Sequence, residues 1–171
     1  MSLVLTFPEA RFERSYNEYI NELGSEVRHP FPLDFDHHDF PALLARIERC
    51  RQGIGLAPEF VASTTFWLVD GNDLVGVSNL RHCLNEWLQD YGGHIGLGVR
   101  PSRRNQGLGS HLLRLTIQQA RSRGIDTVHV HCYRSNPASA KVIMRNGGAL
   151  ASEGRHGQAS EIIQRYCIAA A

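Results

Sequence analysis

Two stretches of the chain carry apolar side chains at the three- and four-residue spacing of an amphipathic helix, residues 9–23 and residues 108–123. Two further helices are expected where proline follows a residue that can cap a helix. One runs to about Arg51, with Asp39 or Phe40 as its cap, and the other runs from Asn136 to about Asn146. The pattern therefore predicts four helices.

Runs rich in β-branched, aromatic and other apolar residues predict strands. The expected strands cover residues 3–6, 64–69, 74–81, 94–99, 127–132, 148–152 and 160–168. The sequence Asp70-Gly71-Asn72-Asp73 between the second and third of them is typical of a hairpin turn. No repeat, low-complexity segment or linker interrupts the pattern, so residues 1–171 are expected to form a single domain.

The composition is that of an ordinary globular protein, with 42% hydrophobic and 20% charged residues. A formal net charge of +1 argues against a general binder of nucleic acid or anionic membranes. No apolar run reaches the roughly 18 residues of a membrane span, and the first residues lack the basic leader of a signal peptide. The four cysteines form no C-x-x-C pair and lack zinc-site spacing, so we expect a cytoplasmic protein with reduced thiols and no metal.

A glycine turn, Arg104-Asn105-Gln106-Gly107-Leu108-Gly109, separates the expected strand at 94–99 from the helix that begins at Leu108. Glycine lets the backbone approach a ligand closely, and the first amides of a helix lack partners within the helix. Because the helix dipole places positive charge at the same end, the turn favours a phosphate or pyrophosphate. A tight connection with glycines for packing is the alternative. Two nucleotide motifs fail on spacing, because the turn has no Walker lysine and Leu112 stands where a dinucleotide fingerprint needs its third glycine.

The sequence VRPSRRNQGLG at residues 99–109 resembles the acetyl-CoA-binding motif of the GNAT family of N-acetyltransferases. A second motif follows in the family's order. It consists of the expected strand at 127–132, the sequence Asn136-Pro137-Ala138-Ser139 and the glycines Gly147 and Gly148. The two motifs cover about residues 93–148, and the wider sequence also resembles a branch of predicted bacterial acetyltransferases.

The resemblance implies a mixed α/β fold, in which helices lie on both faces of a twisted, mostly antiparallel sheet. The strands at 94–99 and 127–132 splay apart in that fold, and acetyl-CoA lies in the opening. The pantetheine arm is expected to pair with the backbone of Leu97 and Val99 and to meet the side chains of Asn136 and Ser139. The amides expected at the pyrophosphate belong to Arg104, Asn105, Gln106, Gly107, Leu108, Gly109 and Ser110.

Acetyl transfer needs a proton donor for the leaving thiolate, and many members of the family use a tyrosine seven residues after the motif asparagine. This chain has Ile143 at that position, and isoleucine cannot donate a proton. Tyr133 is the first candidate to replace the tyrosine, and Cys132 is the second. Water is the third, because a thiol with a pKa of about 8.5 is a tolerable leaving group. The competing interpretations are a loop aromatic for Tyr133 and a small buried hydrophobe for Cys132.

The general base is expected in the loop that enters the strand at 94–99. Glu86 is the first choice, taking the amine proton directly or through water, because the family commonly places a carboxylate near that strand. His82 and His94 titrate near neutral pH and are alternatives. A solvated carboxylate and two structural histidines are the competing interpretations.

Other charged residues bear on the phosphates and on the acceptor. Arg103 and Arg104 could add charge to the phosphates or be solvated loop residues. Arg81 could hold a carboxylate of the acceptor or brace its loop. Asp34 and Asp36 lie in a run of acids and histidines whose spacing does not suit a metal and favours a solvated loop. The resemblance places this region beside the acceptor, where the two acids could select a cationic amine.

The expected function is direct transfer of an acetyl group from acetyl-CoA to a primary amine of a small molecule or a protein N-terminus. A non-catalytic acyl-CoA-binding regulatory module is the alternative, because Ile143 replaces the usual acid. The expected partners are a small-molecule or peptide amine, with no nucleic acid and no membrane. The frequent dimers of the family allow a homodimer.

Overall fold

Four α-helices and seven strands follow one another in the predicted order in the computed structural model, which describes residues 2–158 and 160–170. The strands are β1 (Leu3–Thr6), β2 (Ser63–Asp70), β3 (Asp73–Arg81), β4 (Ile95–Val99), β5 (Val128–Tyr133), β6 (Ala149–Gly154) and β7 (Ile163–Ile168). The helices are α1 (Glu13–Leu23), α2 (Phe40–Gln52), α3 (Leu108–Arg121) and α4 (Pro137–Arg145). Short helical turns cover Ala10–Phe12, Phe31–Asp34, Leu88–Gly92 and Pro101–Arg103.

The observed bounds differ from the prediction chiefly at the start of two elements. A helix is predicted from residue 9, whereas a 3₁₀ turn at Ala10–Phe12 precedes α1, a common form for the first turn of a helix without a side-chain cap. The last strand is predicted from residue 160, whereas β7 begins at Ile163, the first of its side chains to be buried. Burial of the apolar face, which the local sequence does not reveal, therefore decides where β7 starts.

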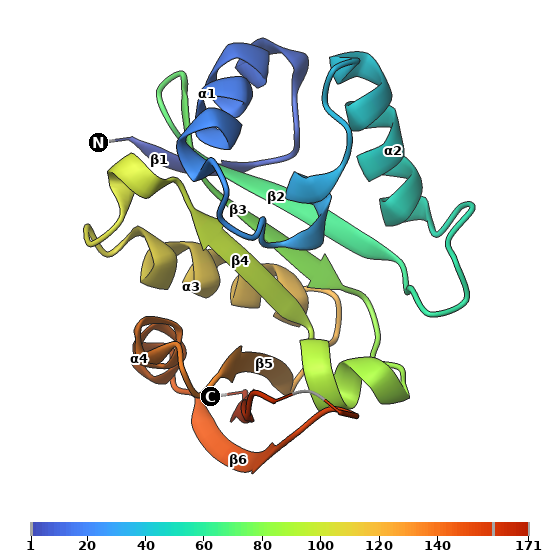
Figure 1. Ribbon diagram of the computed structural model, residues 1–171, viewed down its shortest axis with the longest axis vertical. Helices are drawn as coiled ribbons and strands as arrows, with labels where there is room; N and C mark the ends of the chain where they lie inside the picture. Colours follow the sequence, from blue (N-terminus) through green and yellow to red (C-terminus); the bar gives the residue numbers. More distant parts are fainter. Residues whose placement is uncertain (1, 159, 171) are drawn as a thin grey trace.

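The strands form two antiparallel sheets that meet at β4 and β5. The first sheet has the order β1-β2-β3-β4 and the second has the order β5-β7-β6. Helices α1 and α2 cover one face of the first sheet and α3 covers the other, as Figure 1 shows. Within the described residues, a single bridge joins the sheets, from Gly93, two residues before β4, to Val130 of β5, and β4 and β5 separate beyond it. The mixed α/β fold with a splayed β4–β5 opening is thus confirmed.

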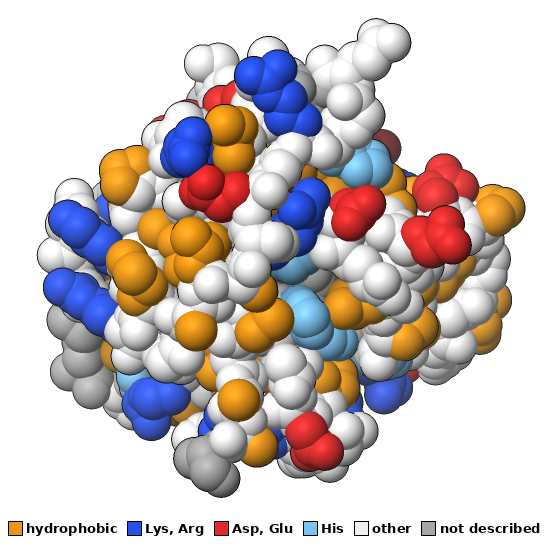
Figure 2. Space-filling view, turned by 90° about the horizontal axis from the view of Figure 1, so that it is seen from below, with side chains coloured by type: hydrophobic (Ala, Val, Ile, Leu, Met, Phe, Trp, Pro, Cys, Tyr) orange, Lys and Arg blue, Asp and Glu red, His pale blue; other side chains and the backbone are white. Residues whose placement is uncertain are grey.

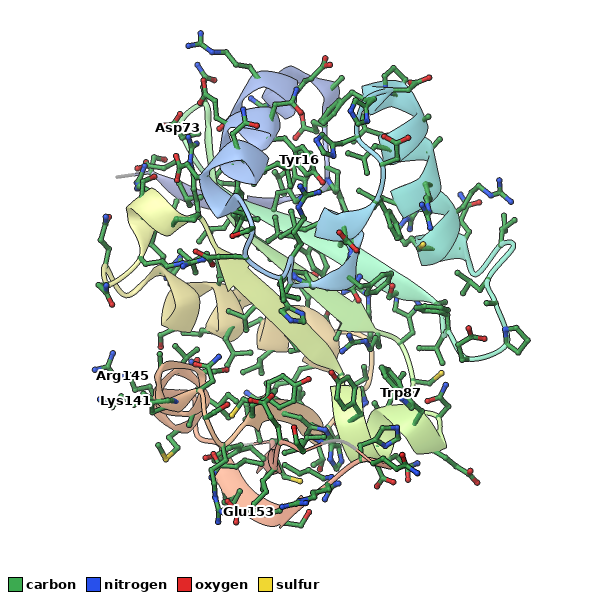
Figure 3. The ribbon with its side chains drawn as sticks, viewed as in Figure 1. Tyr16, Asp73, Trp87, Lys141, Arg145 and Glu153 are labelled. Atoms are coloured by element: carbon green, nitrogen blue, oxygen red, sulfur yellow. The ribbon has the colours of Figure 1, made fainter. Side chains whose placement is uncertain are left out.

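An aromatic core fixes α1 and α2 on the first sheet. Trp67 of β2 is 0% exposed and stacks on Tyr16 of α1, with ring centroids 5.5 Å apart. Phe12 and Phe40 meet the same indole ring at 6.2 and 6.3 Å. Figure 3 shows Tyr16 on the side of α1 that faces the sheet. This packing holds the segment between α1 and α2 over the sheet.

A second core joins the two sheets on the opposite face. Leu113 and Ile117 of α3 pack with Ile95 of β4 and with Val128 and Val130 of β5. Helix α3 therefore packs against both sheets where β4 and β5 separate. None of the helices in the described part of the chain is both long and apolar enough to cross a lipid bilayer.

Candidate active site

The edge of β4 that faces β5 carries unpaired backbone groups. Hydrogen bonds to β3 flank the strand, from the Arg81 amide to the His94 carbonyl (2.8 Å) and from the Arg100 amide to the Val75 carbonyl (3.0 Å). Along a strand of an antiparallel ladder, residues that hydrogen-bond the neighbouring strand alternate with residues whose backbone groups point the other way. The backbone N–H and C=O groups of Leu97 and Val99 therefore point away from β3, toward the opening. These are the residues predicted to pair with pantetheine, although the Val99 carbonyl also accepts a hydrogen bond from Nε of Arg104 (3.1 Å).

His94 closes the narrow end of the opening. Its amide donates to the His129 carbonyl (2.7 Å), and the His129 amide donates to Nδ1 of the His94 ring (3.0 Å). Burial lowers the pKa of His94 to about 4, so the imidazole is neutral at pH 7. The hydrogen bonds of His94 to His129 therefore fit a structural role, the alternative to a general base. The other histidine considered as a base, His82, lies outside the cavity described below and hydrogen-bonds through Nε2 to Thr64 Oγ1 (2.7 Å).

The glycine turn presents free amides at the other end of β4. Gly107 has φ +78° and caps α3, and the helix ladder begins with the bond from the His111 amide to the Gly107 carbonyl (3.1 Å). The amides of Leu108, Gly109 and Ser110 are therefore the unpaired first amides of α3. Packing does not demand the glycine at 109, because a Cβ there would meet the nearest side chains at 3.5 Å, an ordinary contact.

Acidic residues of α1 and the following turn hold this loop in place. Arg100 Nε pairs with Glu22 (2.7 Å), and Arg104 Nη2 pairs with Glu26 (2.8 Å). The Ser102 amide also donates to Glu22 (3.0 Å). In the sequence, the four-residue spacing of Glu18 and Glu22 places both acids on one face of the predicted helix, whereas no helical spacing indicates Glu26, which lies after α1.

Arg103 is similarly engaged. Its Nη2 lies 2.8 Å from Asp70, the last residue of β2. The guanidinium groups of Arg103 and Arg104 thus hold the loop against neighbouring elements. The Arg104 amide, predicted to meet the pyrophosphate, donates instead to the Pro101 carbonyl (3.3 Å), so the first amides of α3 are the groups left to meet phosphates.

A cavity of about 310 Å³ lies where β4 and β5 separate. It is lined by His29, Pro30, Phe31, Arg81, Tyr91, Gly92, Ile95, Gly96, Leu97, Val130, His131, Cys132, Tyr133, Asn136, Ser139 and Ile163. Six candidate site residues from the sequence are brought together there: Arg81, Leu97, Cys132, Tyr133, Asn136 and Ser139. The free amides of α3 lie at the opposite end of β4, so the edge of β4 connects them with the cavity.

Asn136 lies at the start of α4, at the cavity wall. Its Oδ1 accepts from the Ser139 amide (3.1 Å) and so caps the helix. The Asn136 side-chain nitrogen remains the group that can donate to a ligand. Figure 3 shows Lys141 and Arg145 projecting outward from α4. Ile143, by contrast, is 1% exposed and packs in the core that joins the sheets, outside the cavity lining.

Tyr133 shares a hydrogen bond with a residue that the sequence did not single out. Its hydroxyl meets that of Tyr91, which lies in the π-helical turn Leu88–Gly92. This hydrogen bond, followed by burial, raises the pKa of Tyr133 to about 12, so the phenol keeps its proton at neutral pH. Cys132 also lines the cavity, and burial raises the pKa of its thiol. Glu86 is exposed and lies outside the lining.

The charge of the cavity is positive. Arg81 Nη1 donates to the carbonyls of Gly92 (3.0 Å) and Gly93 (3.1 Å), and the residues that line the cavity include no acid. Asp34 and Asp36 lie outside it, and Asp36 bonds to His38 (2.7 Å). Within the described residues no group of three or more histidine, cysteine or acidic side chains could hold a metal. Figure 2 shows charges of both signs dispersed among hydrophobic side chains on the lower face.

Comparison with known proteins identifies the class. The family described as acetyltransferase (GNAT) matches residues 20–147, and the chain belongs to this family. It is therefore a CoA-dependent acyltransferase of the N-acetyltransferase class, and its cosubstrate is acetyl-CoA. No curated protein sequence matches the chain.

Solved structures share the fold at low sequence identity. The ribosomal-protein-S5-alanine acetyltransferase from Vibrio fischeri is 13% identical, with a TM-score of 0.72 over 99% of this chain and 93% of the other. The putative acetyltransferase YncA from Salmonella typhimurium, solved with acetyl-CoA, is 14% identical, with a TM-score of 0.67 over 99% and 94%. A chimera of the spermidine N-acetyltransferase SpeG from Vibrio cholerae and hSSAT is 12% identical, with a TM-score of 0.65 over 99% and 96%.

Proposed function

We propose that this single-domain protein transfers the acetyl group of acetyl-CoA directly to a primary amine of a small molecule or a protein N-terminus. One observation carries the proposal: the unpaired edge of β4 leads from the free amides of α3 to the cavity. An extended, amide-bearing arm can pair with that edge while its phosphates meet the amides. The thioester then lies beside Leu97, at the cavity.

The reaction exchanges one bond for another. The amine nitrogen attacks the thioester carbonyl carbon, the carbon–sulfur bond breaks, the nitrogen loses a proton and the thiolate gains one. Tyr133 is the proposed proton donor because it lines the cavity and is protonated at neutral pH. Glu86, being exposed, would receive the amine proton through water.

The buried Ile143 supports the second candidate, a non-catalytic acyl-CoA-binding regulatory module. Release of free CoA in the presence of an amine separates the two, because a regulatory module binds acetyl-CoA without turnover. A cytoplasmic location and a homodimer remain predictions.

Calorimetric titration tests the proposed site. Acetyl-CoA is titrated into the wild type, Gly107→Trp and Asn136→Ala, with ATP and NAD as control ligands. We expect micromolar binding of acetyl-CoA to the wild type and loss of it in Gly107→Trp, which places a large side chain beside the free amides. A folded wild type that does not bind acetyl-CoA would overturn the proposal.

A further inference from the structure

Arg81 is a partly buried cation without an acidic partner in the described structure. Its two hydrogen bonds, both from Nη1, end on the carbonyls of Gly92 and Gly93. Burial lowers its pKa to about 10, so it stays charged at neutral pH. The partly buried Arg100 and Arg103, in contrast, each meet a carboxylate within 2.8 Å. A guanidinium removed from water without an anion is costly, which points to an anion supplied by a ligand.

The free side of this guanidinium faces the cavity. Nη2 and Nε of Arg81 donate to none of the described residues, and neither atom is sealed from solvent. A Cβ at Gly96 would lie only 3.7 Å from Nη2, so the bare backbone of β4 leaves Nη2 uncovered. Arg81 therefore offers two donors at the narrow end of the opening, beyond the part of β4 assigned to pantetheine.

The other side chains that line the cavity indicate the chemistry of the rest of the ligand. Phe31, Tyr91 and Ile163 line the same cavity with aromatic and aliphatic surface. The acids considered for a cationic amine, Asp34 and Asp36, are outside the lining. The lining also contains polar side chains, His29 and His131 among them. The cavity thus combines one arginine and no acid with a partly apolar wall, a setting that disfavours a polyamine.

We propose that Arg81 binds the carboxylate of the acceptor, and that the acceptor is a small amine bearing a carboxylate and an apolar side chain, as in a free amino acid. The forked guanidinium matches a carboxylate in two-point contact. The inference rests on the proposed acetyl transfer and specifies its acceptor.

The test compares matched acceptors in an assay of thiol release from acetyl-CoA. Each of L-leucine, L-methionine and L-phenylalanine is assayed as the free acid, the carboxamide and the decarboxylated amine, with spermidine as a cationic probe. We expect kcat/KM for at least one free acid to exceed that of its carboxamide by about tenfold or more, the effect of one charge-assisted hydrogen bond. Binding of the same compounds to the CoA-loaded protein is measured by calorimetry.

Variants at Arg81 separate ligand binding from support of the loop. Arg81→Met should bring the ratio of acid to carboxamide close to one, mainly through KM, and Arg81→Lys should restore part of it. Loss of the bonds to Gly92 and Gly93 alone would slow all acceptors equally and leave the ratio unchanged. Arg51→Met on α2 is the matched control, because Arg51 is exposed and pairs with Glu48 away from the cavity.

Three results would overturn the inference. The first is a wild type that prefers carboxamides or spermidine. The second is an unchanged acid-to-carboxamide ratio in Arg81→Met. The third is the absence of both turnover and binding for every free acid. Tighter binding of succinyl-CoA than acetyl-CoA, lost in Arg81→Met, would assign the carboxylate to the acyl donor and also refute an acceptor site. Acetyl-CoA affinity of the wild type, measured separately, shows whether the proposed transfer itself has failed.

Discussion

The two ends of β4 handle positive charge in opposite ways. Beyond its carboxyl end, Arg100, Arg103 and Arg104 pair with carboxylates of α1, of the turn after α1 and of the end of β2. At its amino end, Arg81 finds only the carbonyls of Gly92 and Gly93. The first region is neutralised by the chain itself, whereas the second keeps an uncompensated cation beside a cavity.

The site therefore has two halves that differ in preorganisation: the cofactor half, at the α3 amides, and the acceptor half, at the cavity beside Arg81. The loop that presents the α3 amides is already ordered by its ion pairs, so a cofactor needs to organise little there. The cavity has its apolar walls and its donors in place and lacks an anion. The cofactor half can therefore be tested by changing the protein, and the acceptor half requires changing the ligand as well.

The largest effect is expected where the two sheets meet, at His94. Its pKa of about 4 in the folded protein lies below the ordinary 6.5, so the unfolded chain binds the proton first as the pH falls. The free energy of unfolding should decrease between about pH 6.5 and pH 4, by up to about 3 kcal/mol. His131, whose pKa burial also lowers to about 4, acts in the same direction.

Urea unfolding of the wild type, His94→Asn and the exposed control His38→Asn at pH 7.5, 6 and 5 measures this effect. Asparagine at 94 offers an acceptor for the His129 amide without titrating, so its pH dependence should be shallower. Identical slopes for the wild type and His94→Asn would assign the acid sensitivity to other groups.

Tyr133 is expected to give the next largest effect, on catalysis. Tyr133→Phe should lower kcat by about a hundredfold, as expected for loss of a general acid, with little change in acetyl-CoA affinity. Tyr91→Phe keeps the Tyr133 hydroxyl and should cost less. Because the pKa of Tyr133 is about 12, the donor should not lose its proton between pH 7 and 10.

Steady-state kinetics on Tyr133→Phe, Tyr91→Phe and Cys132→Ser distinguish the candidate donors. A Tyr133→Phe variant that keeps more than half of the wild-type kcat would leave Cys132 or water as the proton source.

Alanine substitutions at two glycines distinguish an effect on packing from an effect on access of the ligand. A Cβ at Gly98 would lie 2.2 Å from the His29 carbonyl oxygen, so Gly98→Ala should displace the α1–α2 segment and destabilise the protein by about 2 kcal/mol. Gly109→Ala meets ordinary contacts and should keep or slightly raise stability, since alanine favours a helix. It should nevertheless weaken acetyl-CoA binding by about tenfold, because the methyl group stands beside the free amides.

Thermal unfolding and calorimetry on both alanine variants check this contrast. Unchanged acetyl-CoA binding in Gly109→Ala would show that the ligand does not approach that residue.

Local signals predicted most of the fold and the cofactor half. Of the two caps predicted for α2, Asp39 and Phe40, the structure selects Asp39, and Asn136 caps the helix it was expected to open, because capping depends on residues adjacent in sequence. The glycine turn is similarly a local motif, and φ +78° at Gly107 explains its glycine. The free amides follow from the start of α3 alone.

The acceptor half depends on contacts between residues distant in sequence. Tyr91 and Tyr133 are 42 residues apart, and no spacing rule joins their hydroxyls. The Arg81 guanidinium is held by the carbonyls of Gly92 and Gly93, 11 and 12 residues further along the chain. The position of Glu86 in the loop before β4 predicts a general base, whereas its side chain is exposed and outside the cavity lining. Tertiary packing decided these positions.

The smallest effect is expected at Arg104, and it tests whether the loop is neutralised by the chain. Arg104 Nη2 pairs with Glu26 and Nε bonds to the Val99 carbonyl, so its guanidinium has little left to offer a phosphate. Arg104→Met should therefore weaken acetyl-CoA binding by less than about threefold, because exposed ion pairs contribute little. Calorimetry on Arg104→Met, Glu26→Gln and the double variant measures it. If Glu26→Gln tightens binding and Arg104→Met weakens it by more than about tenfold, the charge of Arg104 reaches the phosphates and the two ends of β4 differ less than their ion pairs indicate.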